Sequence, residues 1–104
     1  MHRRLRKPKF SFNIPIGYLE AVDLFNRGEY SDALPLFREA CEEKSTYADF
    51  RFAFARCLVM LNDDNGALLE LSEALQLNPH YVDALLEVAF ILARQGQIPQ
   101  ARGY

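Results

Sequence analysis

The segment GEYSDAL (28–34) returns 34 residues later as NDDNGAL (62–68) and, after the same interval, as GQIPQAR (96–102). Each copy begins with Gly or Asn, which adopt the left-handed backbone conformation easily, and each carries an alanine at its sixth position. Other small and apolar residues keep the same interval, namely Ala21, Ala55 and Ala89, and Leu24, Leu58 and Leu92. A period of this length indicates a tandem repeat of one supersecondary unit.

Each unit reads as two short amphipathic helices separated by a turn. In residues 20–40 the apolar side chains follow helical spacing until the pattern breaks at Arg27–Gly28. Ser31 and Asp64 are expected to be N-caps, and Asn78–Pro79 to cap and open the helix that follows. The chain is therefore predicted to be all-α. The predicted helices lie near 16–27, 31–43, 47–60, 64–76 and 80–94, with a sixth starting near 98.

The recurring alanines are predicted to lie where the two helices of a hairpin approach each other closely. A larger side chain at such a point would push the helices apart. We therefore expect four of these side chains to be buried at helix contacts: Ala33, Ala55, Ala67 and Ala89.

These columns resemble the tetratricopeptide repeat, and NGALLELSEALQLNP (65–79) is similar to a near-complete second half of one. The resemblance covers residues 14–104. It implies antiparallel helix-turn-helix hairpins stacked as a short solenoid of about two and a half repeats, at about 14–47, 48–81 and an incomplete 82–104. Residues 1–13 are expected to form a basic, disordered arm. The family resemblance also implies an adaptor or scaffold that binds other proteins.

In this family the first helix of each hairpin lines a concave groove. When the family's groove positions are matched to this sequence, the resemblance implies a partner-binding groove. Its residues are Tyr18, Val22, Phe25, Phe52, Arg56, Val59, Met60, Leu86, Phe90 and Arg94. So apolar and aromatic a surface suits a bound peptide or amphipathic helix. The alternative is that rings such as Phe25 and Phe52 pack into the core and face no partner.

One subclass of the family uses basic groove residues to hold the C-terminal carboxylate of chaperones. The matching positions here hold no basic residue and include Asp83 and Glu87. These two carboxylates would repel such a ligand, so a chaperone tail is not expected as the partner.

Motifs for catalysis, cofactors and metals are absent from the sequence. It has no glycine-rich phosphate loop, and neither His2 nor His80 has a carboxylate or thiol at ligand spacing. Cys41 and Cys57 form no metal or redox motif and are expected to be small buried hydrophobes. We therefore expect no enzymatic activity, no cofactor and no metal.

Charge is unevenly distributed along the chain. Residues 1–10 hold five Lys or Arg and no acid, whereas the rest of the sequence carries a net charge of −7. A basic arm can bind nucleic acid or an anionic membrane, although the acidic body would repel phosphates. The alternatives are a solvated tail, or an arm that contacts the acidic repeats of a second copy.

Hydropathy gives an expectation for location. No run of 18 apolar residues occurs, and no apolar stretch follows the basic start. Neither a membrane span nor a secretory signal is therefore expected, and the chain is expected in the cytoplasm.

The third repeat stops before a complete second helix, which leaves one apolar flank of the helix near 80–94 uncovered. We expect a homo-oligomer that covers this flank, with Leu85, Val88, Leu92 and Tyr104 near the contact. The alternative is a structural fragment of a longer tetratricopeptide-repeat protein that supplies the missing helix itself and has no dedicated ligand in this segment.

Overall fold

The computed structural model describes residues 14–96, and this part of the chain forms five helices and no strand. The helices are α1 (Ile16–Asn26), α2 (Tyr30–Glu43), α3 (Ala48–Met60), α4 (Asp64–Leu77) and α5 (Val82–Arg94). The all-α prediction is confirmed, with helix bounds within about two residues of those expected. The sixth helix expected near 98 lies outside the described residues.

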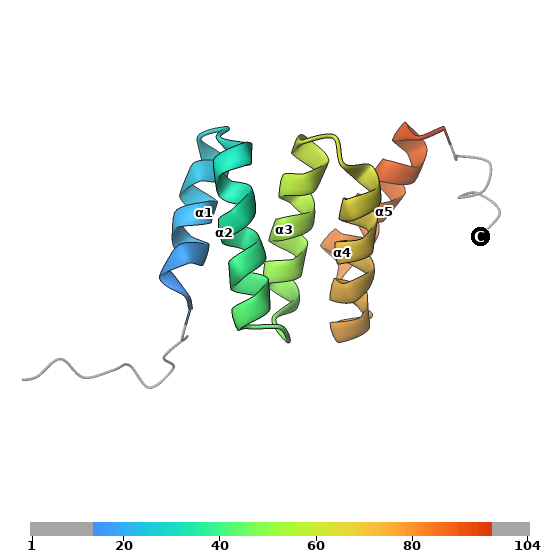
Figure 1. Cartoon of the computed structure of the whole chain (residues 1–104). Coiled ribbons are helices and arrows are strands. Elements are labelled where there is room, and N and C mark those ends of the chain that lie inside the picture. The colour runs from blue at the N-terminus through green and yellow to red at the C-terminus, as the bar shows by residue number, and fades with distance from the viewer. Residues whose placement is uncertain (1–13, 97–104) are drawn as a thin grey trace, which may run out of the picture.

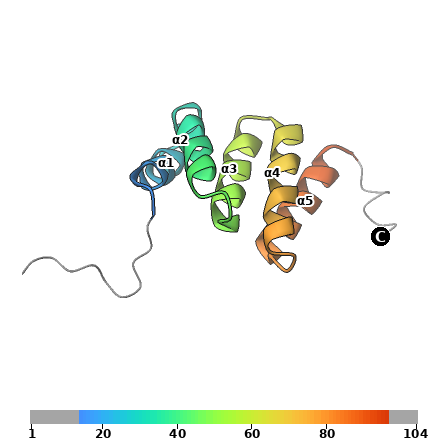
Figure 2. The same cartoon turned by 60° about the horizontal axis from the view of Figure 1, so that its bottom comes forward.

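The helices stack in chain order, each running antiparallel to the one before it (Figure 1). α1 pairs with α2 and α3 with α4, while α5 packs against α4 (Figure 2). α1 also contacts α3, so the first helices of consecutive hairpins meet. None of the helices in residues 14–96 is both long and apolar enough to cross a membrane.

The repeat in the sequence produces the same turn twice. Gly28 and Asn62 both have positive φ, at 82° and 65°. After each of them the chain closes with an equivalent backbone hydrogen bond, from Glu29 N to Leu24 O at 2.8 Å and from Asp63 N to Leu58 O at 2.9 Å. In each case the residue after the left-handed one donates its N–H to a carbonyl in the last turn of the helix. Many helices end with this hydrogen bond. Gly96 also has positive φ, at 78°.

The predicted N-caps are wrong. α2 begins at Tyr30, so Ser31 already lies in the first turn, and the N-cap residue Glu29 makes no side-chain capping bond. α4 is capped by Asp63 rather than Asp64, because the turn at Asn62 leaves a single residue before the helix. The Asp63 Oδ1 atom accepts a hydrogen bond from the Gly66 N–H at 2.9 Å.

The start of α5 also differs from the prediction. Asn78 is the C-cap of α4, and its Oδ1 accepts a hydrogen bond from the His80 N–H at 3.3 Å. The Tyr81 N–H donates to Asn78 O at 3.1 Å, so these residues form a turn. The helix therefore begins at Val82, with Tyr81 as its N-cap residue.

One continuous core of small and aromatic side chains joins the helices. Ala21, Ala33, Ala55 and Ala67 are each 0 % exposed. Larger side chains fill the space between them, led by Phe37, Leu71 and Ile91. The expectation of buried alanines is thus confirmed at three of its four positions.

Ala89 is the exception, because it is exposed. It occupies the repeat position of Ala21 and Ala55, and those two alanines are fully buried in the core. Within residues 14–96, α5 has only α4 and the helices before it to pack against, and these bury Ala84 and Ile91 instead. The flank of α5 that carries Ala89 is therefore open.

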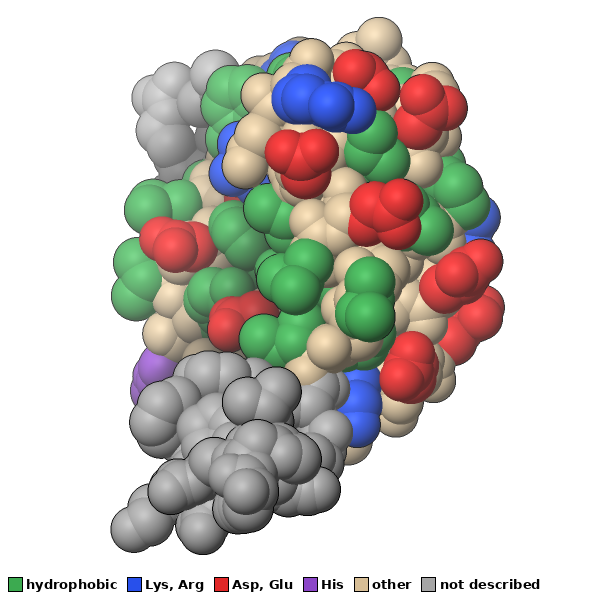
Figure 3. All heavy atoms as spheres, turned by 90° about the vertical axis from the view of Figure 1, so that its left-hand side faces the viewer, with side chains coloured by type: hydrophobic (Ala, Val, Ile, Leu, Met, Phe, Trp, Pro, Cys, Tyr) green, Lys and Arg blue, Asp and Glu red, His purple; other side chains and the backbone are tan. Residues whose placement is uncertain are grey.

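Apolar side chains also remain exposed on the first helix, where Ile16 and Leu19 lie outside the core. Figure 3 views the molecule from the α1–α2 end and shows hydrophobic side chains grouped in the middle of this face, with acidic side chains both among them and along one edge. The surface of the first hairpin is therefore part apolar and part acidic.

Candidate functional site

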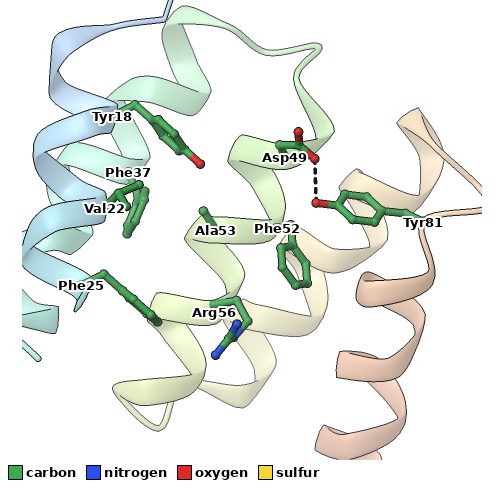
Figure 4. A pocket seen from close by; sticks show the side chains of 9 residues that line it. All are labelled: Tyr18, Val22, Phe25, Phe37, Asp49, Phe52, Ala53, Arg56 and Tyr81. Carbon is green, nitrogen blue, oxygen red and sulfur yellow. Dashed lines mark hydrogen bonds between the residues drawn. The ribbon is translucent and has the colours of Figure 1, made fainter.

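A hollow of about 300 Å³ lies between α1 and α3, and Tyr81 of the loop before α5 borders it. Its walls are mainly aromatic (Figure 4). The lining residues are Tyr18, Val22, Phe25, Phe37, Asp49, Phe52, Ala53, Arg56 and Tyr81. We call it the aromatic hollow.

The rings of the aromatic hollow are held by other rings behind them. Tyr18 stacks on Phe50, with ring centroids 4.1 Å apart, and meets the edge of Phe37 at 5.9 Å. Phe25 meets Phe37 edge-on at 6.3 Å. Such stacked and edge-to-face pairs fix the orientation of each ring. Tyr18 and Phe25 are half-buried, so one side of each ring packs on the core and the other lines the hollow, whereas Phe37 is buried.

A carboxylate lies at one end of the aromatic hollow. The Tyr81 hydroxyl donates a hydrogen bond to Asp49 Oδ1 at 2.7 Å, and the Tyr81 ring lies 5.2 Å from the Phe52 ring (Figure 4). Burial, followed by this hydrogen bond and the charge of Asp49, raises the pKa of Tyr81. Burial and the Asp49 charge also raise the pKa of Tyr18. Both phenols therefore stay neutral hydrogen-bond donors at physiological pH.

Arg56 lies at the other end, where the aromatic hollow meets a second one. Its guanidinium lies 5.7 Å from the centroid of the Phe25 ring and pairs with Glu87 of α5, with Nε to Oε1 at 3.8 Å. The second hollow, of about 450 Å³, lies between α3 and α5. We call it the apolar hollow; its lining residues are Arg56, Val59, Met60, Leu86, Glu87, Phe90 and Arg94.

The apolar hollow exposes large hydrophobic side chains. Leu86 is 63 % exposed, Phe90 53 % and Met60 43 %. Arg94 covers one face of Phe90, with its guanidinium carbon 5.3 Å from the ring centroid, and is hydrogen-bonded to Asp64 Oδ1 of α4. The first helices α1, α3 and α5 thus share one face with two hollows joined at Arg56.

Comparison with known families gives this arrangement a name. Residues 24–73 match the family model described as tetratricopeptide repeat. The match runs from the end of α1 through most of α4, and so includes both left-handed turns and the buried alanines between them. The chain contains a tetratricopeptide repeat. Tetratricopeptide repeats are in general non-catalytic modules that mediate protein–protein interactions.

Each of the ten groove residues listed above lies on the wall of one of the two hollows, whereas Asp83, also matched to a groove position, lines neither. Tyr18, Val22, Phe25 and Phe52 line the aromatic hollow, and Arg56 lines both. Val59, Met60, Leu86, Phe90 and Arg94 line the apolar hollow. Val59 is buried, however, so its side chain offers little surface. Phe25 and Phe52 were expected either to line the groove or to pack into the core. Each does both in part, since each is half-buried and also borders the aromatic hollow.

Phe37 and Tyr81 line the aromatic hollow, although neither lies on a first helix from which the groove residues were predicted. Phe37 belongs to α2, a second helix of a tetratricopeptide hairpin, but its ring reaches the aromatic hollow between α1 and α3. Tyr81 precedes α5, in a stretch that the sequence assigned to the helix itself. The repeat offered one signal, because Tyr81 lies 34 residues after Tyr47, whose ring packs 5.0 Å from Phe50 at the start of α3.

The residues predicted for self-association are spread over different environments. Leu85 is exposed, Leu92 is half-buried, and Val88 packs against the core of its own chain. Tyr104 lies outside the described residues, as does the basic arm expected at residues 1–13. Of the predicted contact residues within α5, Leu85 is therefore the most accessible.

The opposite face of the tetratricopeptide stack is more polar. A hollow of about 320 Å³ between α2, α3 and α4 is spanned by an ion pair from Arg51 Nη1 to Glu70 Oε1, at 3.0 Å. Both side chains of this pair are mostly buried, whereas Leu69 beside them is exposed. This outer face supplies matched control positions for the groove.

The two cysteines are buried within the stack. Burial raises the pKa of both thiols, from 9.0 to about 11. The Cys57 thiol donates to Tyr30 O, with Sγ to O at 3.3 Å. Within residues 14–96, no group of three or more His, Cys, Asp or Glu side chains is arranged to hold a metal ion.

Proposed function

We propose that this chain is a protein-interaction adaptor that binds a peptide or helix of another protein in the groove formed by α1, α3 and α5. The observation that supports this most strongly is the exposure of Met60, Leu86 and Phe90 around one hollow. Exposed apolar surface of this kind is costly in water and commonly marks a binding site. Docking a hydrophobic segment would remove these side chains from water.

The two hollows suit one continuous ligand. They meet at Arg56, which lines both, so a single segment can place side chains in each. An amphipathic helix would do so with apolar residues three or four positions apart, and an extended peptide with alternate residues. Met60 adds a flexible, polarisable side chain that adapts to different ligand shapes.

We propose that the module acts by binding alone, without catalysis or a cofactor. The charged side chains of the groove are engaged in contacts that hold the helices together. Arg56 pairs with Glu87, Arg94 is bonded to Asp64, and Asp49 accepts a hydrogen bond from Tyr81. Each of these contacts joins two different segments of the fold and so helps to hold the groove in shape.

The buried cysteines support a reducing compartment such as the cytoplasm. Cys41 and Cys57 are the only cysteines of the sequence, and both are free thiols in the core. Chains that fold in oxidising compartments more often use cysteines in disulfides.

The proposal is tested by selecting a displayed library of random peptides on the immobilised full chain. The best binder is then measured against Leu86→Ala and against Leu69→Ala, a matched control on the outer face. The two leucines are similarly exposed, at 63 % and 60 %, so both variants lose the same side chain from a surface position. We expect Leu86→Ala to weaken binding by about tenfold or more, as when a buried leucine anchor is truncated.

Leu69→Ala should leave the affinity unchanged. If both variants bind as tightly as the original chain, the groove of α1, α3 and α5 is not the binding site. If Leu69→Ala alone weakens binding, the site lies on the outer face.

A second candidate is self-association through the open flank of α5. The observation that favours it is the exposure of Ala89 and Leu85, although Ala21 and Ala55, at the repeat position of Ala89, are fully buried. Two copies related by a twofold axis could cover this flank on each other. Such contacts would also serve a purely structural array of repeats, in which this segment has no ligand of its own.

Light scattering of the full chain over a range of concentrations tests this second candidate. We expect a mass that rises towards a dimer, and a shift back to monomer in Leu85→Gln but not in Leu69→Gln. A monomer at every concentration up to tens of micromolar would contradict self-association and leave the groove proposal standing.

A further inference from the structure

The aromatic hollow has a distinct chemistry at the end where α3 begins. Asp49 lies there, and the rings of Tyr18, Phe52 and Tyr81 border the same hollow (Figure 4). The Tyr18 hydroxyl points from α1 towards the side of the hollow on which Asp49 and Tyr81 lie. One exposed carboxylate therefore borders the same hollow as aromatic rings from three different segments.

The charge of Asp49 is not balanced by a basic side chain within residues 14–96. The two arginines of the groove already have acidic partners, Glu87 for Arg56 and Asp64 for Arg94. Asp49 has no ion pair with Lys or Arg in the described part of the chain, and its hydrogen-bond partner there is the neutral Tyr81 hydroxyl, which reaches only Oδ1. This end of the groove is therefore negative, with one carboxylate oxygen open.

A simpler role for Asp49 is to stabilise the first turn of α3, where an acidic side chain complements the helix dipole. That role needs only an acid at this position. It does not account for the hydrogen bond that Tyr81 makes to Asp49 from beyond α4, nor for the ring-lined hollow beside the carboxylate. These two features orient the carboxylate relative to a space of about 300 Å³ that a ligand side chain can enter.

We propose that this end of the aromatic hollow receives a Lys or Arg side chain of the bound segment. The cationic group would pair with Asp49, and its methylenes would lie against Tyr18, Phe52 and Tyr81. Aromatic faces attract cations as well as apolar stems. Because the apolar hollow lies beyond Arg56, the segment carries its apolar anchors on one side of this basic residue. This inference rests on the proposed function, since it names the chemistry of the partner in the same groove.

The test uses peptides from the displayed library selected on the full chain, with the best binder synthesised in two forms. One form keeps its Lys or Arg and the other has Gln at that position. Both are measured against the original chain, Asp49→Asn and Asp32→Asn. Asn keeps the size of Asp49 and an oxygen that can accept from Tyr81. Asp32 is a matched control, because it is an exposed first-turn acid of α2 that lines neither hollow.

We expect Lys or Arg to be enriched among the selected peptides. Asp49→Asn should lower the affinity for the basic peptide by about fivefold to tenfold. This is the effect expected of a partly screened ion pair reinforced by cation–π contact. The Gln form should bind the original chain and Asp49→Asn equally, and Asp32→Asn should match the original chain. The difference between the two forms should shrink as salt is added.

Selected peptides without basic residues, or a basic peptide that binds Asp49→Asn as tightly as the original chain, would overturn the inference. The affinity of Leu86→Ala for the same peptides distinguishes failure of the groove proposal from failure of the cation site. If Leu86→Ala weakens the peptides but Asp49→Asn does not, the groove proposal stands and the cation site is wrong. If neither variant has an effect, the groove proposal fails as well.

Discussion

Enlarging one alanine in two consecutive repeats tests the packing directly. Ala55 and Ala89 are 34 residues apart and hold the same position in α3 and α5. Ala55 is 0 % exposed, whereas Ala89 is exposed. Leucine at either site keeps a good helix former, so any difference between Ala55→Leu and Ala89→Leu reports on packing alone.

The expected magnitude follows from the space around each residue. At position 55 three additional carbon atoms have no room between α3 and α4, and overpacking of this kind destabilises by about 1–3 kcal/mol. At position 89 the added carbons extend into solvent, where surface substitutions change stability by about 0.5 kcal/mol or less. For a domain of this size each kcal/mol lowers Tm by about 4–8 °C, so Ala55→Leu should lower Tm by roughly 5–20 °C.

Thermal unfolding followed by circular dichroism in the helical bands provides the measurement. It is made at low protein concentration, so that contacts between copies do not contribute. We expect a clear fall in Tm for Ala55→Leu and a Tm within a few degrees of the original for Ala89→Leu. An unchanged Tm for Ala55→Leu would show that the helix phase derived from the repeat is wrong.

Three further perturbations test separate parts of the structure. Asp63→Ala removes the capping bond to the Gly66 N–H and should cost about 1 kcal/mol in urea unfolding, whereas Asp32→Ala, which removes no cap, should cost clearly less. Tyr81→Phe removes the hydrogen bond to Asp49 but keeps the ring, and should cost about 1 kcal/mol; an equal loss in Tyr47→Phe would argue against a specific bond. Because burial raises the pKa of Cys41 and Cys57 from 9.0 to about 11, the folded state favours the neutral thiols. Their contribution to stability is complete below pH 9 and is lost as the pH rises from 9 towards 11. In urea unfolding, a Cys41→Ala, Cys57→Ala double variant should lose less stability over that range than the original chain. The same pH dependence in both proteins would show that the two thiols do not cause the loss.

Much of the fold could be predicted because the repeated residues mark both the turns that end helices and the contacts between helices. Gly28 and Asn62 end helices through the same left-handed turn, and their spacing locates the hairpins. Ala21 and Ala55 mark the close approach of two helices, which fixes the phase of each helix about its axis. That phase was enough to place all ten predicted groove residues on the walls of the two hollows.

The features that the sequence did not predict depend on single residues at element boundaries. Ser31 and Asp64 have the chemistry of N-caps, but the position of a cap is set by where the preceding turn ends, and both lie just inside their helices. Tyr81 reaches Asp49 only because α5 starts at Val82 rather than at 80. Ala89 carries the repeat signal but is exposed, because its burial depends on a neighbouring helix and not on α5 itself.

The central claim is that α1, α3 and α5 form the binding groove, and the position of a bound peptide tests it most directly. Chemical-shift changes of the labelled full chain would be recorded by NMR as the best selected peptide is added. We predict the largest changes at the two hollows, above all at Phe52, Met60 and Phe90. Largest changes on the outer face instead, around Arg38 and Leu69 of α2 and α4, would contradict the claim.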